Sequence, residues 1–260
     1  PEDDLKQTIN TQPAIVTMSI AAMESLKSQI DINADYVAGH SLGEYSALCA
    51  AEVMPISVGA RLLKVRAKAM AEAVPAGLGA MMAIIGLDID TVRKVCEKAS
   101  TETEKCSVAN DNCPGQIVIS GHKSAIEKAE GIAKEMGARK SVILPVSVPA
   151  HCPLMASAKE VVEEALSEIT LKNPIVSFVS NRTAEIATDA KDIKEHLALQ
   201  MVNGVRFRES VDFMISKGVD NFAEIGSGNV LSGLVKRCTD KAVSTPVGSV
   251  ETISEFLKTL

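Results

Sequence analysis

The stretch ADYVAGHSLGEY, residues 34–45, decides the fold of this chain. Its apolar first half predicts a short buried strand, and the small residues that continue to position 52 are typical of a helix. Between the two, Gly39-x-Ser41-x-Gly43 fits the nucleophile elbow, a sharp turn from strand to helix with an outward serine hydroxyl. We therefore expect an α/β fold in which Ser41 has a strained backbone conformation and acts as a nucleophile.

The elbow pattern also predicts the surroundings of the serine. We expect a Cβ at either flanking glycine, Gly39 or Gly43, to collide with the neighbouring strand or helix. The following helix carries free N–H groups at the positive end of its dipole, so the N–H of Leu42 is expected to face a developing oxyanion. The pattern is short, and an ordinary structural turn is the alternative.

Strand and helix patterns alternate along most of the chain. Outside residues 79–146, helical patterns cover 13–29, 56–73, 155–168, 189–202, 206–217 and a stretch that begins near 228, and strand patterns cover 174–180 and 219–225. Apolar strands that alternate with helices predict a mostly parallel sheet covered on both faces. The first helix is expected to begin behind Pro13.

Residues 79–146 have a pattern of their own. Strands are predicted at 80–85, 107–109, 116–120 and 141–146, and helices at 88–99 and 124–136. Asp88 is the expected N-cap of the first helix, Gly137 ends the second, and residues 110–115 are expected to form a turn. This βαββαβ order is the ferredoxin-like pattern, here as an insert in the larger domain.

Composition and charge exclude several classes of function. The net charge of −6 argues against a nucleic-acid partner, because phosphate contacts need a basic face. The sequence has no run of about 18 apolar residues, so no membrane partner is expected. The six cysteines have neither Cys-x-x-Cys nor zinc-ligand spacing, which predicts reduced thiols, a cytoplasmic location and no metal site.

A serine nucleophile needs a base that is neutral near pH 7, and histidine is the usual one. The chain has four histidines: His40, His122, His151 and His196. His40 adjoins the serine and should point away from it, whereas His151 lies on a loop where the chain re-enters the larger domain. His151 is therefore the predicted base, with a capping or exposed histidine as the alternative. No carboxylate stands out as the third group, so a backbone carbonyl could orient the imidazole.

Arg66 is the other notable residue, because it has apolar neighbours on the helix predicted over 56–73. A buried arginine usually pairs with an anion, and its planar fork matches a carboxylate. The alternative is an arginine on a solvated helix face.

Several motifs occur in an order that gives the chain a family resemblance. GHSLGEY at 39–45 resembles the signature of malonyl-CoA:acyl carrier protein transacylases. The other matches are TQPA at 11–14, L-x-x-x-R-x-x-x-M ending at Met70, GAM at 79–81, NCPGQ at 112–116, SVPAH at 147–151 and EIGSG at 224–228. The resemblance covers nearly the whole chain and is far more specific than the elbow alone.

By this resemblance, the fold is an α/β-hydrolase-like parallel-sheet domain with an inserted ferredoxin-like βαββαβ subdomain. The large domain is expected over residues 1–76 and 147–260, and the small subdomain over 77–146. The family opens with a further strand and G-Q-G-S-Q upstream of the TQPA match, which this chain lacks. In the family the backbone N–H of a glutamine of that segment is the second oxyanion donor, so an inactive truncated fragment that acts as a binding module is one alternative.

The resemblance also implies roles for individual residues. Ser41 would be the nucleophile and His151 the general base, with the main-chain carbonyl of Gln200 orienting the histidine. Arg66 and His40 would bind the substrate, and Arg66 would hold the free carboxylate of the malonyl group.

The activity implied by the resemblance is transfer of a malonyl group from malonyl-CoA to the phosphopantetheine thiol of acyl carrier protein, through a malonyl-serine intermediate, in fatty-acid biosynthesis. Malonyl-CoA and acyl carrier protein are the expected partners, with no cofactor and with a monomeric enzyme. The second alternative is a serine hydrolase or thioesterase, although common α/β-hydrolases carry their histidine later in the chain. Methylmalonyl as the acyl group and polyketide synthesis as the pathway stay open.

Overall fold

The computed structural model describes residues 2–5, 7–146 and 148–259, so the expected boundary residue Ser147 lies outside the described residues. The helices are α1 (Glu2–Leu5), α2 (Thr8–Lys27), α3 (Gly43–Ala50), α4 (Ile56–Ala73), α5 (Ile89–Ala99), α6 (Lys123–Glu135), the 3₁₀ helix η1 (Pro153–Met155), α7 (Ala156–Ser167), α8 (Ala190–Gln200), α9 (Phe207–Ser216), α10 (Val230–Cys238) and α11 (Val250–Leu257). The strands are β1 (Tyr36–Ala38), β2 (Gly79–Ile85), β3 (Cys106–Cys113), β4 (Gln116–His122), β5 (Lys140–Ile143), β6 (Ser177–Val179), β7 (Ile186–Ala187), β8 (Asn221–Ile225) and β9 (Val243–Val247).

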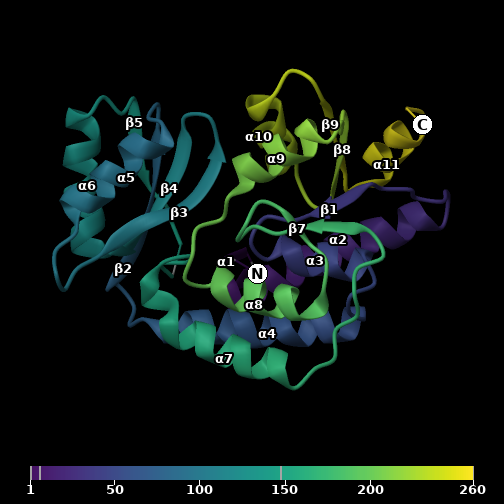
Figure 1. The fold of residues 1–260 in the computed structure, drawn as a ribbon, viewed down its shortest axis with the longest axis horizontal. Helices are drawn as coiled ribbons and strands as arrows, with labels where there is room; N and C mark the ends of the chain where they lie inside the picture. The colour runs from purple at the N-terminus through teal and green to yellow at the C-terminus, as the bar shows by residue number, and fades with distance from the viewer. Residues whose placement is uncertain (1, 6, 147, 260) are drawn as a thin grey trace.

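The largest core lies between β1 and β6 and the helices α2, α3, α4, α7 and α8 (Figure 1). Its fully buried members include Tyr45 of α3, Leu63 of α4, Phe178 of β6 and Leu197 of α8. Helix α4 packs against both α2 and α7. Burying apolar surface of this extent is the main stabilising contribution to the part of the fold that carries the elbow.

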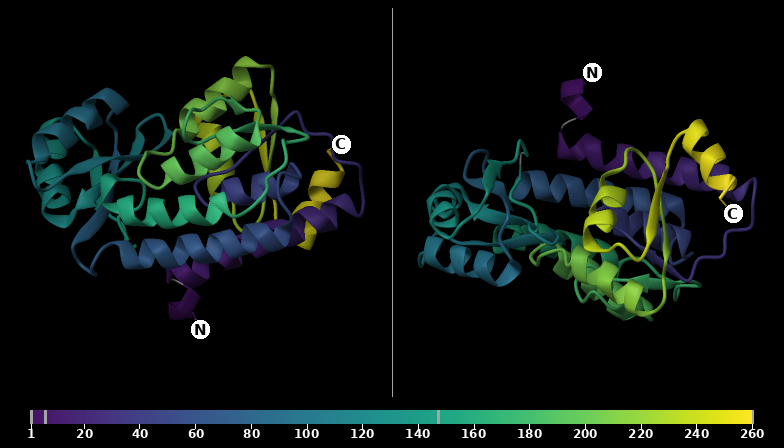
Figure 2. Two further views of the ribbon diagram at one scale, coloured as in Figure 1. Left: turned by 60° about the horizontal axis from the view of Figure 1, so that its bottom comes forward. Right: turned by 90° about the horizontal axis from the view of Figure 1, so that it is seen from above.

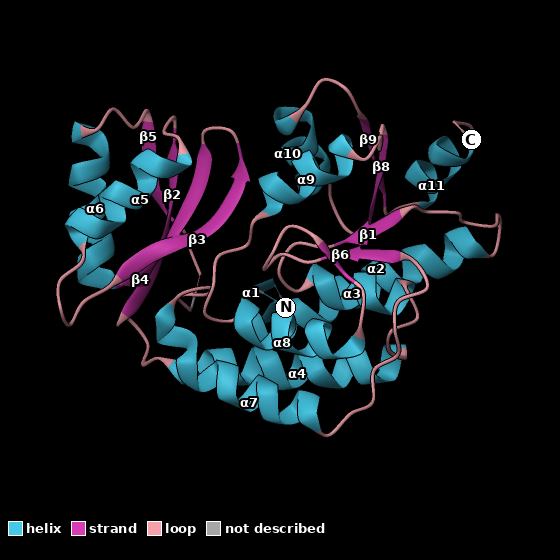
Figure 3. Cartoon of the chain, in the orientation of Figure 1, coloured by secondary structure: helices cyan, strands magenta, loops and turns pink. Residues whose placement is uncertain are grey.

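The parallel strands of this part of the chain divide into two sheets rather than one. β1 pairs in parallel with β6, which also carries the short antiparallel β7, while β8 pairs in parallel with β9 (Figure 3). The parallel pairing is therefore confirmed, but among the described residues the expected sheet is divided into two. The reason is that the pattern of apolar residues identifies strands, whereas neighbours in a sheet are chosen by contacts between distant segments.

The segment from β2 to β5 forms the expected ferredoxin-like unit. The chain order is β2, α5, β3, β4, α6, β5, and the antiparallel sheet order is β3-β4-β2-β5. Alternate residues of β2 and β4, such as Met82 and Ile119, pack against both helices in one core. Asp88 is the N-cap of α5 and accepts a hydrogen bond from Thr91 N at 2.8 Å, as predicted. The division of the chain into domains at residues 77 and 146 stays a prediction.

Two local predictions were wrong. The strand β3 continues through residues 110–113, which were expected to form a turn. Two register shifts accommodate the polar residues, the side chains of Asp111 and Asn112 have tertiary partners, and the backbone of Asn110 forms a bridge with Val205. Pro13 lies inside α2 instead of opening it. The helix begins earlier because Thr11 N bonds to Gln7 O at 2.8 Å, which forms a turn ahead of the proline.

The ferredoxin-like unit and the β8–β9 pair lie toward opposite ends of the long helices α4 and α7 in both views of Figure 2. Among the described residues, no helix is both long enough and apolar enough to span a bilayer.

Candidate active site

Ser41 occupies the turn between β1 and α3 with a φ of 55°, in the left-handed region. Non-glycine residues in this region are strained, which confirms the conformation predicted from the elbow. A Cβ built on Gly39 would lie 2.0 Å from the carbonyl carbon of Gly43, so the expected collision is confirmed at this position. At Gly43 the expectation is wrong, since a Cβ there has no heavy atom within 4 Å and points away from the described neighbours.

The two glycines therefore make a matched pair of variants. We expect Gly39→Ala to lower the free energy of unfolding by roughly 3 kcal/mol, because the clash is with backbone that no side-chain rotation can relieve. We expect Gly43→Ala, at the first residue of α3, to change it by no more than about 1 kcal/mol and in the stabilising direction. Urea denaturation followed by circular dichroism measures both, and equal losses in the two variants would contradict the clash at Gly39.

His151 lies beside the serine and meets the geometric requirement for a base. Its Nε2 is 2.8 Å from Ser41 Oγ, and its Nδ1 is 2.8 Å from the main-chain oxygen of Gln200. Because a carbonyl only accepts, Nδ1 carries the proton and Nε2 keeps its lone pair toward the hydroxyl. The structure thus brings together the three residues that sequence reasoning selected for these positions. His151 itself has a φ of 60°, so both members of this hydrogen-bonded pair have a left-handed backbone.

The imidazole of His151 is held in its neutral form. The pKa of His151 is lowered to about 3, mainly by burial and also by the nearby Arg66 cation, while the Gln200 carbonyl opposes the shift. A neutral imidazole has a free lone pair on Nε2 that can accept the serine proton.

Arg66 is 1% exposed, so the alternative of a solvated arginine is wrong. Its Nη2 donates to Ser41 Oγ at 2.8 Å and to Gln200 Oε1 at 3.0 Å, and its Nη1 donates to Gln12 Oε1 at 2.5 Å. Its Nε has no hydrogen-bond partner, and the guanidinium forms no salt bridge, within the described part of the chain. Burial lowers the pKa of Arg66, which Tyr45 and Glu44 oppose. A desolvated cation that lies beside the serine and forms no salt bridge with the described residues is suited to bind a negatively charged substrate group.

His40 and Leu42 flank the serine in different ways. The His40 ring turns away from Ser41, as expected, and its Nε2 is 2.8 Å from Asn112 Oδ1 while the ring packs 5.4 Å from that of Phe207. Burial lowers the pKa of His40, so it is a neutral group. The Leu42 N–H meets no acceptor among the residues described and is free for an oxyanion. The substrate-binding role of His40 and the oxyanion role of Leu42 stay predictions.

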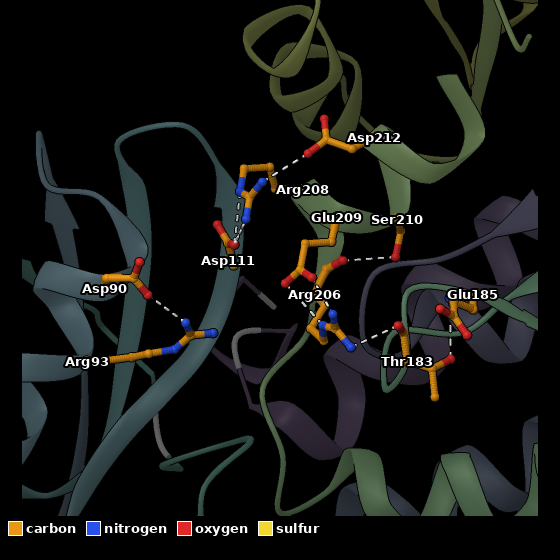
Figure 4. Close-up of polar contacts among 10 residues, drawn as sticks. All are labelled: Asp90, Arg93, Asp111, Thr183, Glu185, Arg206, Arg208, Glu209, Ser210 and Asp212. Atoms are coloured by element: carbon orange, nitrogen blue, oxygen red, sulfur yellow. Dashed lines mark hydrogen bonds and ion pairs between the residues drawn. The ribbon is translucent and has the colours of Figure 1, made fainter. Parts of the chain in front are cut away.

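Asn112 is held against His40 by contacts between β3 and the start of α9. Arg208 of α9 donates to Asp111 at 3.0 Å and to Asp212 at 2.9 Å (Figure 4). Backbone bonds between Val205 and Ala109 and between Asp111 and Val205, at 2.8 and 2.9 Å, join the same segments. The ferredoxin-like unit therefore contributes a side chain to the surroundings of the elbow.

The acyl transferase domain family matches residues 1–254 of the sequence. The chain belongs to the acyl transferase domain family. This acyltransferase is 44% identical over 258 residues to the malonyl CoA-acyl carrier protein transacylase of Bacillus subtilis (strain 168), covering 99% of this chain and 81% of that protein. It is 41% identical over 258 residues to the protein of the same name from Escherichia coli (strain K12), with 99% and 83% covered.

Solved structures confirm the α/β acyltransferase fold. The acyl-carrier-protein-S-malonyltransferase from Bartonella henselae superposes with a TM-score of 0.96 at 40% identity, covering 100% of this chain and 83% of that one. A type II PKS acyl-carrier protein in complex with its malonyl-transacylase gives a TM-score of 0.97 at 38% identity, with 100% and 84% covered. The family resemblance and the fold class predicted from the sequence are both confirmed.

Sequence reasoning missed two buried polar residues of the acyltransferase site, Glu44 and Asn181, which are 1% and 0% exposed. The sequence around each of these residues contains a feature that could have identified it. Glu44 is a charged residue in the first turn of a helix made of small and apolar residues, and Asn181 follows the strand β6 at its carboxyl end, where α/β folds place functional groups. No cluster of metal-ligating side chains occurs among the described residues.

Proposed function

We propose that this acyltransferase transfers a malonyl group from malonyl-CoA to the phosphopantetheine thiol of acyl carrier protein, in fatty-acid biosynthesis. The observation that carries the proposal is the buried guanidinium of Arg66 at 2.8 Å from Ser41 Oγ. An acyl group bound to this oxygen brings its free carboxylate next to a cation that forms no salt bridge with the described residues. The names of the relatives and the solved complex with an acyl-carrier protein support the same substrate and partner.

The first half-reaction forms a malonyl-serine ester. His151 Nε2 takes the proton of Ser41 as Oγ attacks the thioester carbonyl, and the Leu42 N–H stabilises the negative charge on the carbonyl oxygen. The Gln200 carbonyl accepts Nδ1–H and stabilises the imidazolium that forms. Collapse of the tetrahedral intermediate breaks the carbon–sulfur bond, and the proton on His151 goes to the departing CoA thiolate.

The second half-reaction runs the same steps with another thiol. The phosphopantetheine thiol gives its proton to His151 and its sulfur attacks the ester carbonyl. The carbon–oxygen bond to Ser41 breaks, and Oγ takes the proton back. The cytoplasmic location, the monomeric state and the lack of nucleic-acid or membrane partners belong to the same proposal.

Dependence on the acceptor tests this function. We expect incubation with malonyl-CoA alone to add one malonyl group to the intact protein and to release little free malonate. Addition of holo acyl carrier protein should discharge the enzyme and add the malonyl mass to the carrier, because a thiol is the acceptor for which the site is proposed. Intact-protein mass spectrometry follows both proteins.

The carrier protein without its phosphopantetheine arm is the matched control, and it should leave the enzyme loaded. Release of malonate at the same rate with and without the carrier would replace the proposal by a serine hydrolase. A chain that acquires no malonyl group would be the inactive binding module.

A further inference from the structure

The side-chain amide of Asn181 spans the turn that carries Ser41. Its Oδ1 accepts a hydrogen bond from Ser41 N at 2.8 Å, and its Nδ2 donates to Gly39 O at 2.6 Å. One planar group thus joins the backbone on both sides of His40, where the chain makes neither strand nor helix hydrogen bonds of its own. The parallel pairing of Ala38 with Val179 brings the ends of β1 and β6 together and so sets Asn181 against the turn.

Glu44 holds Asn181 in this position and connects it to the histidine side of the site. Glu44 Oε1 accepts a hydrogen bond from the backbone N–H of Asn181 at 2.6 Å, and Oε2 accepts one from Gln200 Nε2. The same Nε2 donates to Ser41 O at 3.0 Å, and the main-chain carbonyl of Gln200 faces His151. A single buried carboxylate therefore links the nucleophile turn to the residue that orients the base.

We propose that Glu44 and Asn181 are positioning residues, a brace that keeps the Ser41 backbone left-handed and aims its hydroxyl at His151. The left-handed conformation of a serine persists only where its surroundings over-determine it, and the brace supplies bonds to the N–H and, through Gln200, to the C=O of that residue. By occupying the Ser41 N–H, Asn181 also leaves the next amide, that of Leu42, directed to the oxyanion. The inference rests on the proposed function, because Ser41 is the nucleophile that the brace positions.

The variant Asn181→Asp separates positioning from mere packing, because it changes almost no volume. A protonated carboxyl reproduces the amide, with one oxygen that accepts from Ser41 N and an O–H that donates to Gly39 O. An ionised carboxylate has no donor for that carbonyl and places a charge against it. Activity of this variant should therefore depend on its own protonation.

Other groups that titrate or carry charge surround the brace and must be taken into account. They are Glu44 and Tyr45 of α3, Arg66 of α4, His40 of the elbow and His151 of the loop before η1. The pKa of Glu44 is raised to about 7, because burial outweighs the lowering by Asn181, Gln200 and Arg66. Every rate is therefore expressed relative to the wild-type rate at the same pH.

The experiment measures single-turnover formation of malonyl-enzyme at a series of pH values from about 5.5 to about 8. We expect Asn181→Asp to react about 10²-fold more slowly than wild type at the alkaline end of this range, because misplacement of a nucleophile typically lowers the rate by a factor of this size. Its relative rate should rise on acidification, by up to about tenfold per pH unit. Asn173→Asp, an exposed residue of the loop before β6, is the matched control and should give a flat ratio near one.

Thermal unfolding at each pH shows whether Asn181→Asp is folded at alkaline pH. If it is not, a second variant, Glu44→Gln, keeps the test decisive. Glu44→Gln keeps an acceptor for Asn181 N but sets an NH₂ group against Gln200 Nε2. We expect it to lower kcat for acylation about tenfold with KM for malonyl-CoA unchanged, since the brace does not touch substrate.

A pH-independent ratio for folded Asn181→Asp, or equal effects of Glu44→Gln on kcat and KM, would overturn the brace. Wild-type protein that fails to form malonyl-enzyme would instead overturn the proposed function.

Discussion

Replacing Ser41 by alanine should lower the rate of malonyl-enzyme formation by at least about 10⁶-fold, as in enzymes whose serine and histidine act as a unit. The variant keeps Arg66 and His151 in place but has no oxygen to carry the acyl group. His151→Ala should lower the rate to a similar extent, and the double variant should be no slower than either single one. Rapid-quench kinetics with intact-mass detection measures all three.

Ser46→Ala is the control for the serine variant. Ser46 lies on α3, five residues along the chain, and its buried hydroxyl has no hydrogen-bond partner among the described residues. Its removal should change the rate by less than about twofold. A Ser41→Ala protein that still gains a malonyl group would mean that another residue is the nucleophile.

Arg66→Ala should slow transfer of malonyl by about 10²–10³-fold, the effect of truncating one member of a buried charge pair. Acetyl transfer should fall by less than about tenfold, because acetyl has no carboxylate and loses only the hydrogen bond from Nη2 to Ser41 Oγ. The measurement is the initial rate with malonyl-CoA divided by that with acetyl-CoA, compared between Arg66→Ala and wild type.

Arg61→Ala tests the same substitution on the exposed face of α4 and should leave both rates unchanged. Thermal unfolding of Arg66→Ala shows whether loss of the partners Gln12 and Gln200 has loosened the fold. Equal losses with both acyl groups, in a folded protein, would show that Arg66 does not select the carboxylate.

Local features of the sequence predicted much of the fold and the position of Ser41. The helix expected over 56–73 is α4 residue for residue, and the elbow places Ser41 between a strand and a helix as expected. The order of elements from β2 to β5 also agrees with the ferredoxin-like pattern. These features depend on side-chain periodicity, caps and glycines, which act over a few residues and can be read from them.

The position of His151 beside the serine is harder to predict from the sequence, because the two residues are 110 positions apart along the chain. Its position at the end of an apolar run identified the loop, but the 2.8 Å contact with Ser41 exists only in the folded chain. The group that orients His151 is harder still to predict, because every residue has a main-chain carbonyl and composition does not distinguish that of Gln200. The motif resemblance, and not the chemistry of the residue, pointed to it.

By itself the sequence determined the turn that carries Ser41, the family, and most of the succession of strands and helices as far as α10, whereas β7, β9 and α11 were not predicted. Only the tertiary structure decided that Arg66 is buried, that residues 110–113 extend β3, and that Glu44 and Asn181 brace Ser41. The brace joins residues 137 and 140 positions apart. Contacts at such separations depend on how whole elements pack, and a polar side chain reveals its partner only after burial has removed the water that could bond to it instead.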